Sequence, residues 1–119
     1  MTIMTRNNAI NYLEIPSTDL AATKQFFSAA FNWQFTDYGP DYTAFTSDEM
    51  SGGFYRSDKV SRQDEGATLI VFYTSELENC KHTIEDHSGT IIKPIFSFPG
   101  GRRFHFTEPG GSEFAVWSE

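Results

Sequence analysis

Residues 99–117, PGGRRFHFTEPGGSEFAVW, carry the pattern that decides the fold of this 119-residue chain. Apolar and polar residues alternate on both sides of the turn Glu108-Pro109-Gly110-Gly111, which predicts a strand-turn-strand hairpin. Because side chains alternate along a strand, the hairpin has two different faces. The apolar face is expected to join the core: Phe104, Phe106, Phe114 and Val116. The mixed face is expected to form the floor of a site: Arg103, His105, Glu113, Ala115 and Trp117.

The same order of elements, βαβββ, is predicted twice along the chain. The first copy comprises a strand at 10–15, a helix from Leu20 to Phe31 and strands at 33–38, 42–46 and 52–56; the second comprises a strand at 68–73, a helix capped at Ser75 and strands at 91–98, 102–107 and 112–117. Leu20 and Leu77 lie 57 residues apart, as do Phe27 and Ile84, and this spacing favours an internal duplication. We therefore predict an α+β fold in a single domain, with module one at about 9–56 and module two at about 67–118. The charged segment 57–66 would link them.

Helix ends are indicated by particular residues. Ser75 is expected to be the N-cap of the second helix, with Glu78 three residues later completing a capping box. Asn32 and Gly89 are expected to end the first and second helices.

The composition limits the partners and the cell compartment. A net charge of −7 argues against nucleic acid or an anionic membrane as a partner, because both attract basic surfaces. The single cysteine, Cys80, fits a reducing cytoplasm, where we expect the protein. The first ten residues contain no apolar run that would indicate a signal peptide, and no segment of the chain has the apolar length of a membrane span.

Four motifs in order resemble those of the vicinal oxygen chelate superfamily, which contains glyoxalase I, bleomycin-resistance proteins and extradiol dioxygenases. These motifs are Asp19-Leu20, Phe26-Phe27 with Phe31-Asn32-Trp33, Gly52-Gly53-Phe54-Tyr55 and Phe106-Thr107-Glu108-Pro109-Gly110-Gly111. The last motif has Glu108 where the family pattern has aspartate. The resemblance covers residues 9–118 and implies two modules that pair into a curved mixed sheet with the helices outside. It also implies a ligand site on the concave face and a homodimer.

Metal-dependent members of that superfamily place His, Gln or Glu on the first and last strands of each module. The resemblance puts the C-terminal ligand at Ala115, the first-strand ligand at Ile10, with Asn11 beside it, and the second-module ligand at about Thr68. These side chains are not the His and carboxylate ligands that a catalytic divalent ion requires. We therefore predict that the domain has no catalytic metal.

Strand parity predicts which residues line the concave site. They are Tyr12, Glu14, Ile70, Phe72, Arg103, His105 and Trp117. Aromatic walls with a few charged groups are typical of a pocket for a small amphipathic or aromatic molecule, which is our first hypothesis. Glu14 and His105 are the candidates for acid-base catalysis, although the sequence does not establish that the domain is an enzyme.

Two other interpretations remain open. The domain could be a lyase, isomerase or dioxygenase that holds a divalent metal through Glu14, His105 and Glu113. Against this, Glu113 lies beside a turn and is expected to be solvated. The domain could also be a protein-interaction module whose cavity is filled, with Glu14 pairing with Arg103 inside it.

Overall fold

The computed structural model describes residues 5–119, so residues 1–4 of the N-terminal segment considered above lie outside it. The first module consists of β1 (Tyr12–Ser17), α1 (Leu20–Phe31), β2 (Gln34–Asp37), β3 (Tyr42–Thr46) and β4 (Ser51–Arg56). The second consists of β5 (Ile70–Tyr73), α2 (Leu77–Asp86), β6 (Thr90–Phe98), β7 (Gly101–Thr107) and β8 (Glu113–Ser118). The predicted α+β class and the double βαβββ order are confirmed.

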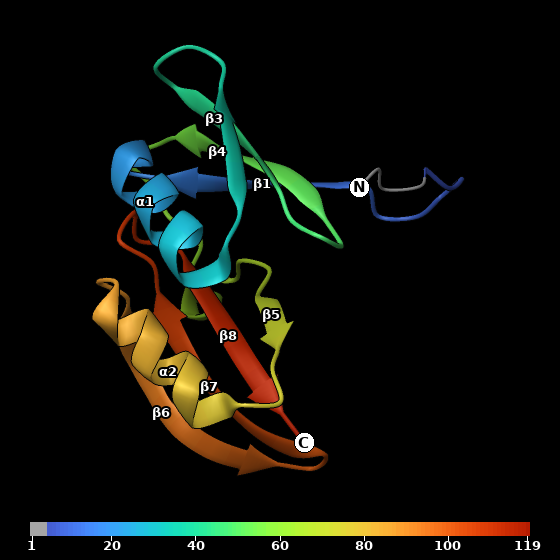
Figure 1. Cartoon of the computed structure of the whole chain (residues 1–119), viewed down its shortest axis with the longest axis vertical. Coiled ribbons are helices and arrows are strands. Elements are labelled where there is room, and N and C mark those ends of the chain that lie inside the picture. Colours follow the sequence, from blue (N-terminus) through green and yellow to red (C-terminus); the bar gives the residue numbers. More distant parts are fainter. Residues whose placement is uncertain (1–4) are drawn as a thin grey trace.

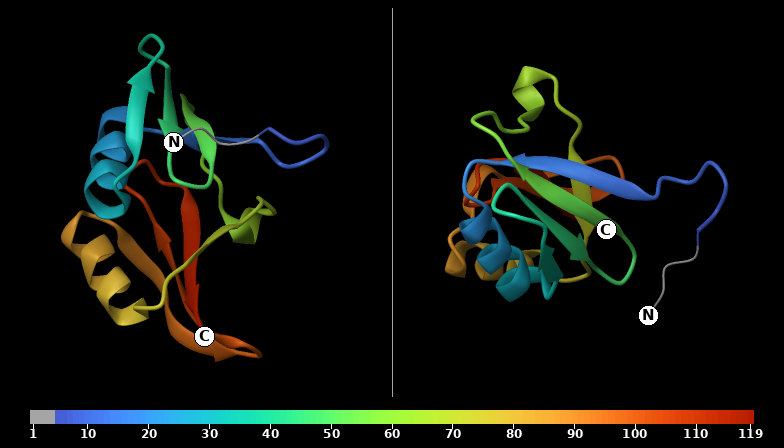
Figure 2. Two further views of the ribbon diagram at one scale, coloured as in Figure 1. Left: turned by 45° about the vertical axis from the view of Figure 1, so that its right-hand side comes forward. Right: turned by 90° about the horizontal axis from the view of Figure 1, so that it is seen from above.

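Each module forms a four-stranded mixed sheet, with the order β1-β4-β3-β2 in the first (sheet A) and β5-β8-β7-β6 in the second (sheet B). The first strand of each module runs parallel to the last, and the other pairs are antiparallel. Both helices lie on the same side of the two sheets (Figures 1 and 2), so each sheet has one helix-covered face and one helix-free face. Within residues 5–119, no helix combines the length and hydrophobicity needed to cross a membrane.

The core consists mainly of phenylalanines and joins the two modules. Phe27 in α1 is fully buried, and its ring lies 5.4 Å from that of Phe54 in sheet A and 5.3 Å from that of Phe114 in sheet B. Ile84, the residue equivalent to Phe27 in the duplication, is also fully buried. Helix α1 therefore packs on both sheets, which makes the two modules one hydrophobic unit.

The turn between β7 and β8 attaches the second module to the first. The Gly110 carbonyl accepts hydrogen bonds from the backbone N–H and the hydroxyl of Thr18, both at 3.0 Å. The Ser112 hydroxyl donates to the Pro16 carbonyl at 2.8 Å. The motif at residues 106–111, which resembles the family pattern, thus has a structural role, because it binds the connection between β1 and α1 in the first module.

Three local expectations are corrected by the structure. The N-cap of α2 is Glu76 rather than Ser75, and its side chain makes no capping hydrogen bond; instead, the Thr74 hydroxyl accepts from the Glu76 N–H at 3.1 Å. The last residue of α2 is Asp86 and its C-cap is His87, two residues before Gly89. The segment between the modules contains a short 3₁₀ helix, η1 (Gln63–Glu65), which its lack of periodicity did not predict. Asn32 does end α1, with φ of 60°.

Candidate functional site

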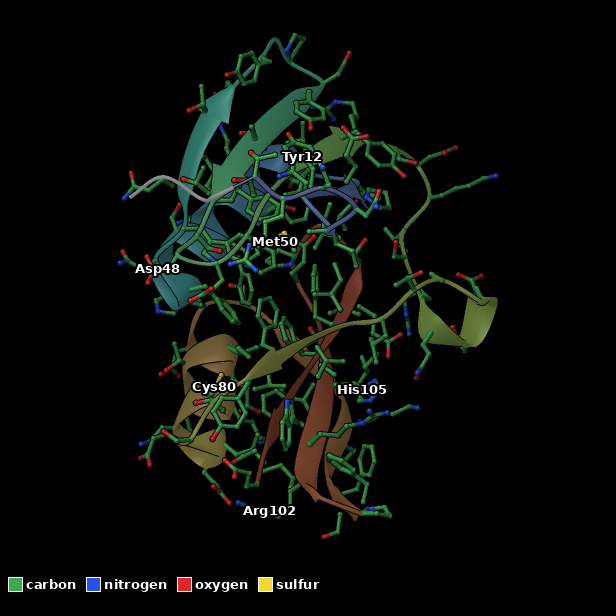
Figure 3. All side chains as sticks on the ribbon, turned by 90° about the vertical axis from the view of Figure 1, so that its right-hand side faces the viewer. Tyr12, Asp48, Met50, Cys80, Arg102 and His105 are labelled. Atoms are coloured by element: carbon green, nitrogen blue, oxygen red, sulfur yellow. The ribbon has the colours of Figure 1, made fainter. Side chains whose placement is uncertain are left out.

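The helix-free faces of the two sheets carry five of the seven predicted site residues. Tyr12 and Glu14 lie on β1, Arg103 and His105 on β7, and Trp117 on β8. Figure 3 shows Tyr12 in the first module and His105 in the second. Large apolar side chains remain exposed on these faces: Tyr12, Tyr55, Val71, Tyr73 and Phe96.

Ile70 and Phe72 lie on the core side of β5 and not on the helix-free face, where strand parity placed them, although Ile70 still lines the pocket between the sheets that is described below. They pair in register with Phe114 and Val116, whose side chains are fully buried, and they pack against the hydrophobic core. The strand assumed at 68–73 begins at Ile70, and its alternating side chains are divided between the two faces in the opposite sense. Val71 and Tyr73 occupy the helix-free face instead.

On sheet A, three polar side chains form one hydrogen-bonded chain. The hydroxyl oxygens of Tyr12 and Tyr42 lie 2.6 Å apart, and the Tyr42 hydroxyl donates to Glu14 Oε2 at 2.9 Å. Partial burial and the hydrogen bonds with Tyr12 and Glu14 raise the pKa of the Tyr42 phenol, so it stays a donor at neutral pH. Sequence reasoning missed Tyr42. The signal was Gly53 on the neighbouring strand, where any Cβ would collide with the Tyr42 ring.

On sheet B, His105 and Glu113 form a buried pair. The distance from His105 Nδ1 to Glu113 Oε2 is 2.8 Å, and the Gln63 N–H donates to Glu113 Oε1 at 2.9 Å. Burial raises the pKa of Glu113, but the hydrogen bonds from His105 and Gln63 and the positive charges of His105 and Arg62 outweigh it, and the pKa is lowered overall. The expectation that Glu113 is solvated is wrong, since only 4% of it is exposed.

Arg103 contacts the aromatic rings of Phe96 and Phe98 and does not pair with Glu14. Its guanidinium carbon lies 5.3 Å from the ring centre of Phe96 and 5.7 Å from that of Phe98, within the range of cation–π attraction. Glu14 is bonded to Tyr42 in the other sheet, so the predicted Glu14–Arg103 pair does not form. Trp117 packs edge-on against Tyr73 at 5.1 Å and Phe98 at 6.1 Å. These contacts give sheet B an aromatic surface around one cation.

A pocket of about 320 Å³ lies between the first strands of the two modules, and we call it the junction pocket. Its polar lining is Glu14, Tyr55, Ser61, Thr68 and Glu113, and its apolar lining is Leu13, Ile15, Pro16, Ile70 and Phe114. His105 does not line it and is fully buried, so this structure does not present its imidazole to a ligand there. Of the two predicted acid-base candidates, only Glu14 borders the pocket.

The positions where the resemblance implied metal ligands do not form a metal site within this chain. Ile10 is 79% exposed, and Ala115 is fully buried with no donor atom in its side chain. Among residues 5–119, no three His, Cys, Asp or Glu side chains lie close enough together to hold one ion. The alternative cluster of Glu14, His105 and Glu113 is therefore not assembled, and we derive no step through a metal.

Sequence reasoning also missed a buried polar network beside the β7–β8 turn. Glu108 Oε1 accepts from the Thr23 hydroxyl at 2.8 Å and from the Gly110 N–H at 2.6 Å, while the Thr23 and Ser17 hydroxyls lie 2.7 Å apart. Burial raises the pKa of Glu108 to about 7, despite the hydrogen bonds from Gly110 and Thr23. This network lies at the attachment between the modules.

Comparison with known proteins agrees with this architecture. The sequence model described as "Glyoxalase/Bleomycin resistance protein/Dioxygenase superfamily" matches residues 9–116. The anthracycline biosynthesis protein DauV of Streptomyces sp. strain C5 is 27% identical over 89% of this chain and 45% of its own length, as is DnrV of Streptomyces peucetius. The chain thus spans about half the length of these curated relatives.

Two solved structures illustrate the shared fold. The fosfomycin resistance protein of Listeria monocytogenes, determined with Mn(II), superimposes with a TM-score of 0.77 at 18% identity, covering 94% of this chain and 90% of that chain. The lactoylglutathione lyase of Agrobacterium tumefaciens gives a TM-score of 0.71 at 17% identity and 96% coverage of both chains. At these identities the likeness establishes the fold, and any function has to be argued from the residues of the site.

Proposed function

Because the chain belongs to the glyoxalase/bleomycin resistance protein/dioxygenase superfamily, we propose that its helix-free faces bind a small amphipathic or aromatic molecule without a catalytic metal. The observation that carries the proposal is the junction pocket, which brings polar groups of both modules together beside exposed aromatic side chains. Pockets of this size with few polar groups and aromatic walls are typical of small-molecule sites.

The polar end of the ligand would lie in the junction pocket. Glu14 offers carboxylate oxygens there, and Tyr55 and Thr68 offer hydroxyls, so hydroxyl or amine donors on the ligand would be recognised. The aromatic end would extend along β8 toward Trp117, about 13 Å from Glu113 at the rise of a strand. This length favours a molecule of several fused rings, and the relatives named anthracycline biosynthesis proteins support that class.

We also propose that a second copy of the chain covers the helix-free faces in a homodimer. Tyr12, Tyr55, Val71, Tyr73 and Phe96 are large side chains that stay 37% to 53% exposed in the single chain. Apolar surface of this kind is commonly covered by a partner or a ligand. Light scattering coupled to size-exclusion chromatography tests the dimer, and a monomer at all protein concentrations would contradict it.

The ligand proposal is tested with the two tryptophans of the chain, Trp33 and Trp117. In a Trp33→Phe variant, Trp117 is the single reporter, and an anthracycline and its uncharged aglycone are titrated against its fluorescence. We expect saturable quenching by both, with the affinity reduced about tenfold by Glu14→Gln through the loss of a charged acceptor. Thermal stabilisation of the wild-type chain by the same compounds should disappear in Trp117→Ala. Binding that is unchanged by both substitutions would contradict the proposed site.

A further inference from the structure

A second pocket, of about 510 Å³, adjoins the junction pocket along β1 and β5, and we call it the apolar pocket. It is bounded by the end of α1, by the loop between β3 and β4, and by β5. Its lining consists of Leu13, Ile15, Phe31, Trp33, Phe45, Ser47, Asp48, Glu49, Met50, Ile70, Val71, Phe72, Tyr73 and Phe114. Figure 3 shows Asp48 and Met50 on the side of the first module that faces the second. The apolar pocket shares Leu13, Ile15, Ile70 and Phe114 with the junction pocket, and Val71 and Tyr73 with the surface proposed for the dimer.

Several aromatic walls of the apolar pocket are held in place by contacts with neighbouring rings. Trp33 is stacked between Phe27 and Phe45, with ring centres 4.5 and 4.2 Å away and interplanar angles of 10° and 11°. Phe31 and Phe72 face each other across the two modules at 4.6 Å. Aromatic side chains fixed in this way lose little conformational entropy when a flat ligand packs against them. The geometry therefore favours a planar apolar body.

The charge of the lining is of one sign. Asp48 and Glu49 are its charged members, both exposed on the β3–β4 loop, and no Lys, Arg or His lines this pocket. By contrast, a nearby pocket of about 300 Å³ beside Glu113 is lined by Arg62 and Lys93. An aromatic interior with an acidic rim complements a molecule that combines flat rings with a positive charge.

We propose that the apolar pocket is a separate binding site for a small molecule with a planar apolar body and a single cationic group. The body packs against the aromatic lining, where it meets the free edge of the Trp33 ring and the side chain of Phe72, and the cation lies at the rim near Asp48 and Glu49. This site does not depend on the ligand proposed for the helix-free faces, since Glu14 and Trp117 are not part of its lining.

The test uses the other tryptophan. In a Trp117→Phe variant, Trp33 is the single reporter, and proflavine, a flat aromatic cation, is titrated against its fluorescence. We expect saturable quenching, and we expect the anion 1-anilinonaphthalene-8-sulfonate to bind at least tenfold more weakly. Equal binding of the two dyes would overturn the proposal. Quenching of Trp117 in the Trp33→Phe variant without quenching of Trp33 in the Trp117→Phe variant would also overturn it.

Charge variants locate the cation. Asp48→Asn with Glu49→Gln should weaken proflavine binding about three- to tenfold, with the effect shrinking at high salt, since two partly solvated ion pairs are removed. Asp64→Asn with Glu65→Gln is the matched control, because it removes two exposed acidic charges from η1 instead. An equal loss in both double variants would show general attraction by the acidic chain, and that result, like no loss in either, would overturn the site.

Discussion

Two carboxyl groups flank the same turn and have opposite properties. Glu108 ends the β7 side and Glu113 begins β8, and they are 2% and 4% exposed. Burial raises the pKa of Glu108 to about 7, whereas for Glu113 the bonds and charges of its neighbours overcome burial and lower the pKa. The difference lies in their partners: Glu108 is bonded to the Thr23 hydroxyl and a backbone N–H and feels the charge of Asp19, while Glu113 faces His105 and Arg62.

The two sides of the turn are therefore stabilised in different ways. On the side that attaches the two modules, the Glu108 carboxyl group has a raised pKa and completes a network with the Thr23 and Ser17 hydroxyls. Its second oxygen, Oε2, has no hydrogen-bond partner in the described chain. On the helix-free side, an ionised carboxylate is held beside a histidine. Burial alone thus does not set the charge of an acidic side chain, because the nearest donors and cations decide it.

The largest expected effect comes from removing the charge of Glu113. Glu113→Gln replaces the charged acceptor beside His105 and the Gln63 N–H with a neutral one and should lower the free energy of unfolding at pH 7 by about 3 kcal/mol. A lowered pKa contributes stability that is present above the unfolded value of 4.5 and lost as the pH falls through the folded value. Urea unfolding from pH 7 to 3 should therefore show the difference between wild type and variant shrinking in acid. A constant difference would contradict the lowered pKa of Glu113.

Glu108→Gln should act in the opposite direction. Because the pKa is raised from 4.5 to about 7, wild-type stability from this group is fully present below pH 4.5 and is lost as the pH rises through 7. The loss amounts to about 3 kcal/mol, and the variant should lack it. Its stability relative to wild type should increase between pH 4 and pH 8 in urea unfolding. A relative stability that does not change with pH would show that folding does not shift the pKa of Glu108.

Much of the fold, but less of the site, could be predicted from the sequence. Alternation in residues 102–117 and the matched spacing of Phe27 and Ile84 identified the hairpin and the duplication, because they depend on local periodicity. Ile70 and Phe72 were assigned to the wrong face because the run TLIVFY is almost continuously apolar, so it has no alternation that shows which side chains face the core. Glu113 was expected in solvent because its partners, His105 and the Gln63 N–H, come together only through β-pairing and the linker.

The hydrogen bond from the Thr23 hydroxyl lowers the pKa of Glu108 and so favours the ionised form of this carboxyl group. Thr23→Val keeps the shape but removes the donor to Glu108, so the pKa of Glu108 should rise further. We expect a loss of about 1 kcal/mol at pH 8, where the ionised form needs the bond, and a smaller loss at pH 4. Thermal unfolding at the two pH values provides the measurement. Equal losses would assign the role of Thr23 to its bond with Ser17 instead.

The smallest effect is expected on the helix-free face of sheet A, where Tyr42 links Tyr12 to Glu14. Tyr42→Phe removes both hydrogen bonds at a surface open to water, so the free energy of unfolding should change by less than about 0.5 kcal/mol. This outcome would distinguish a surface arranged for a ligand from the buried pair of sheet B, where one lost charge is costly. The same variant should weaken ligand binding at the junction pocket, because Glu14 loses the phenol that positions it. Strong destabilisation by Tyr42→Phe in urea unfolding would instead make the Tyr12–Tyr42–Glu14 chain a structural element comparable to His105–Glu113.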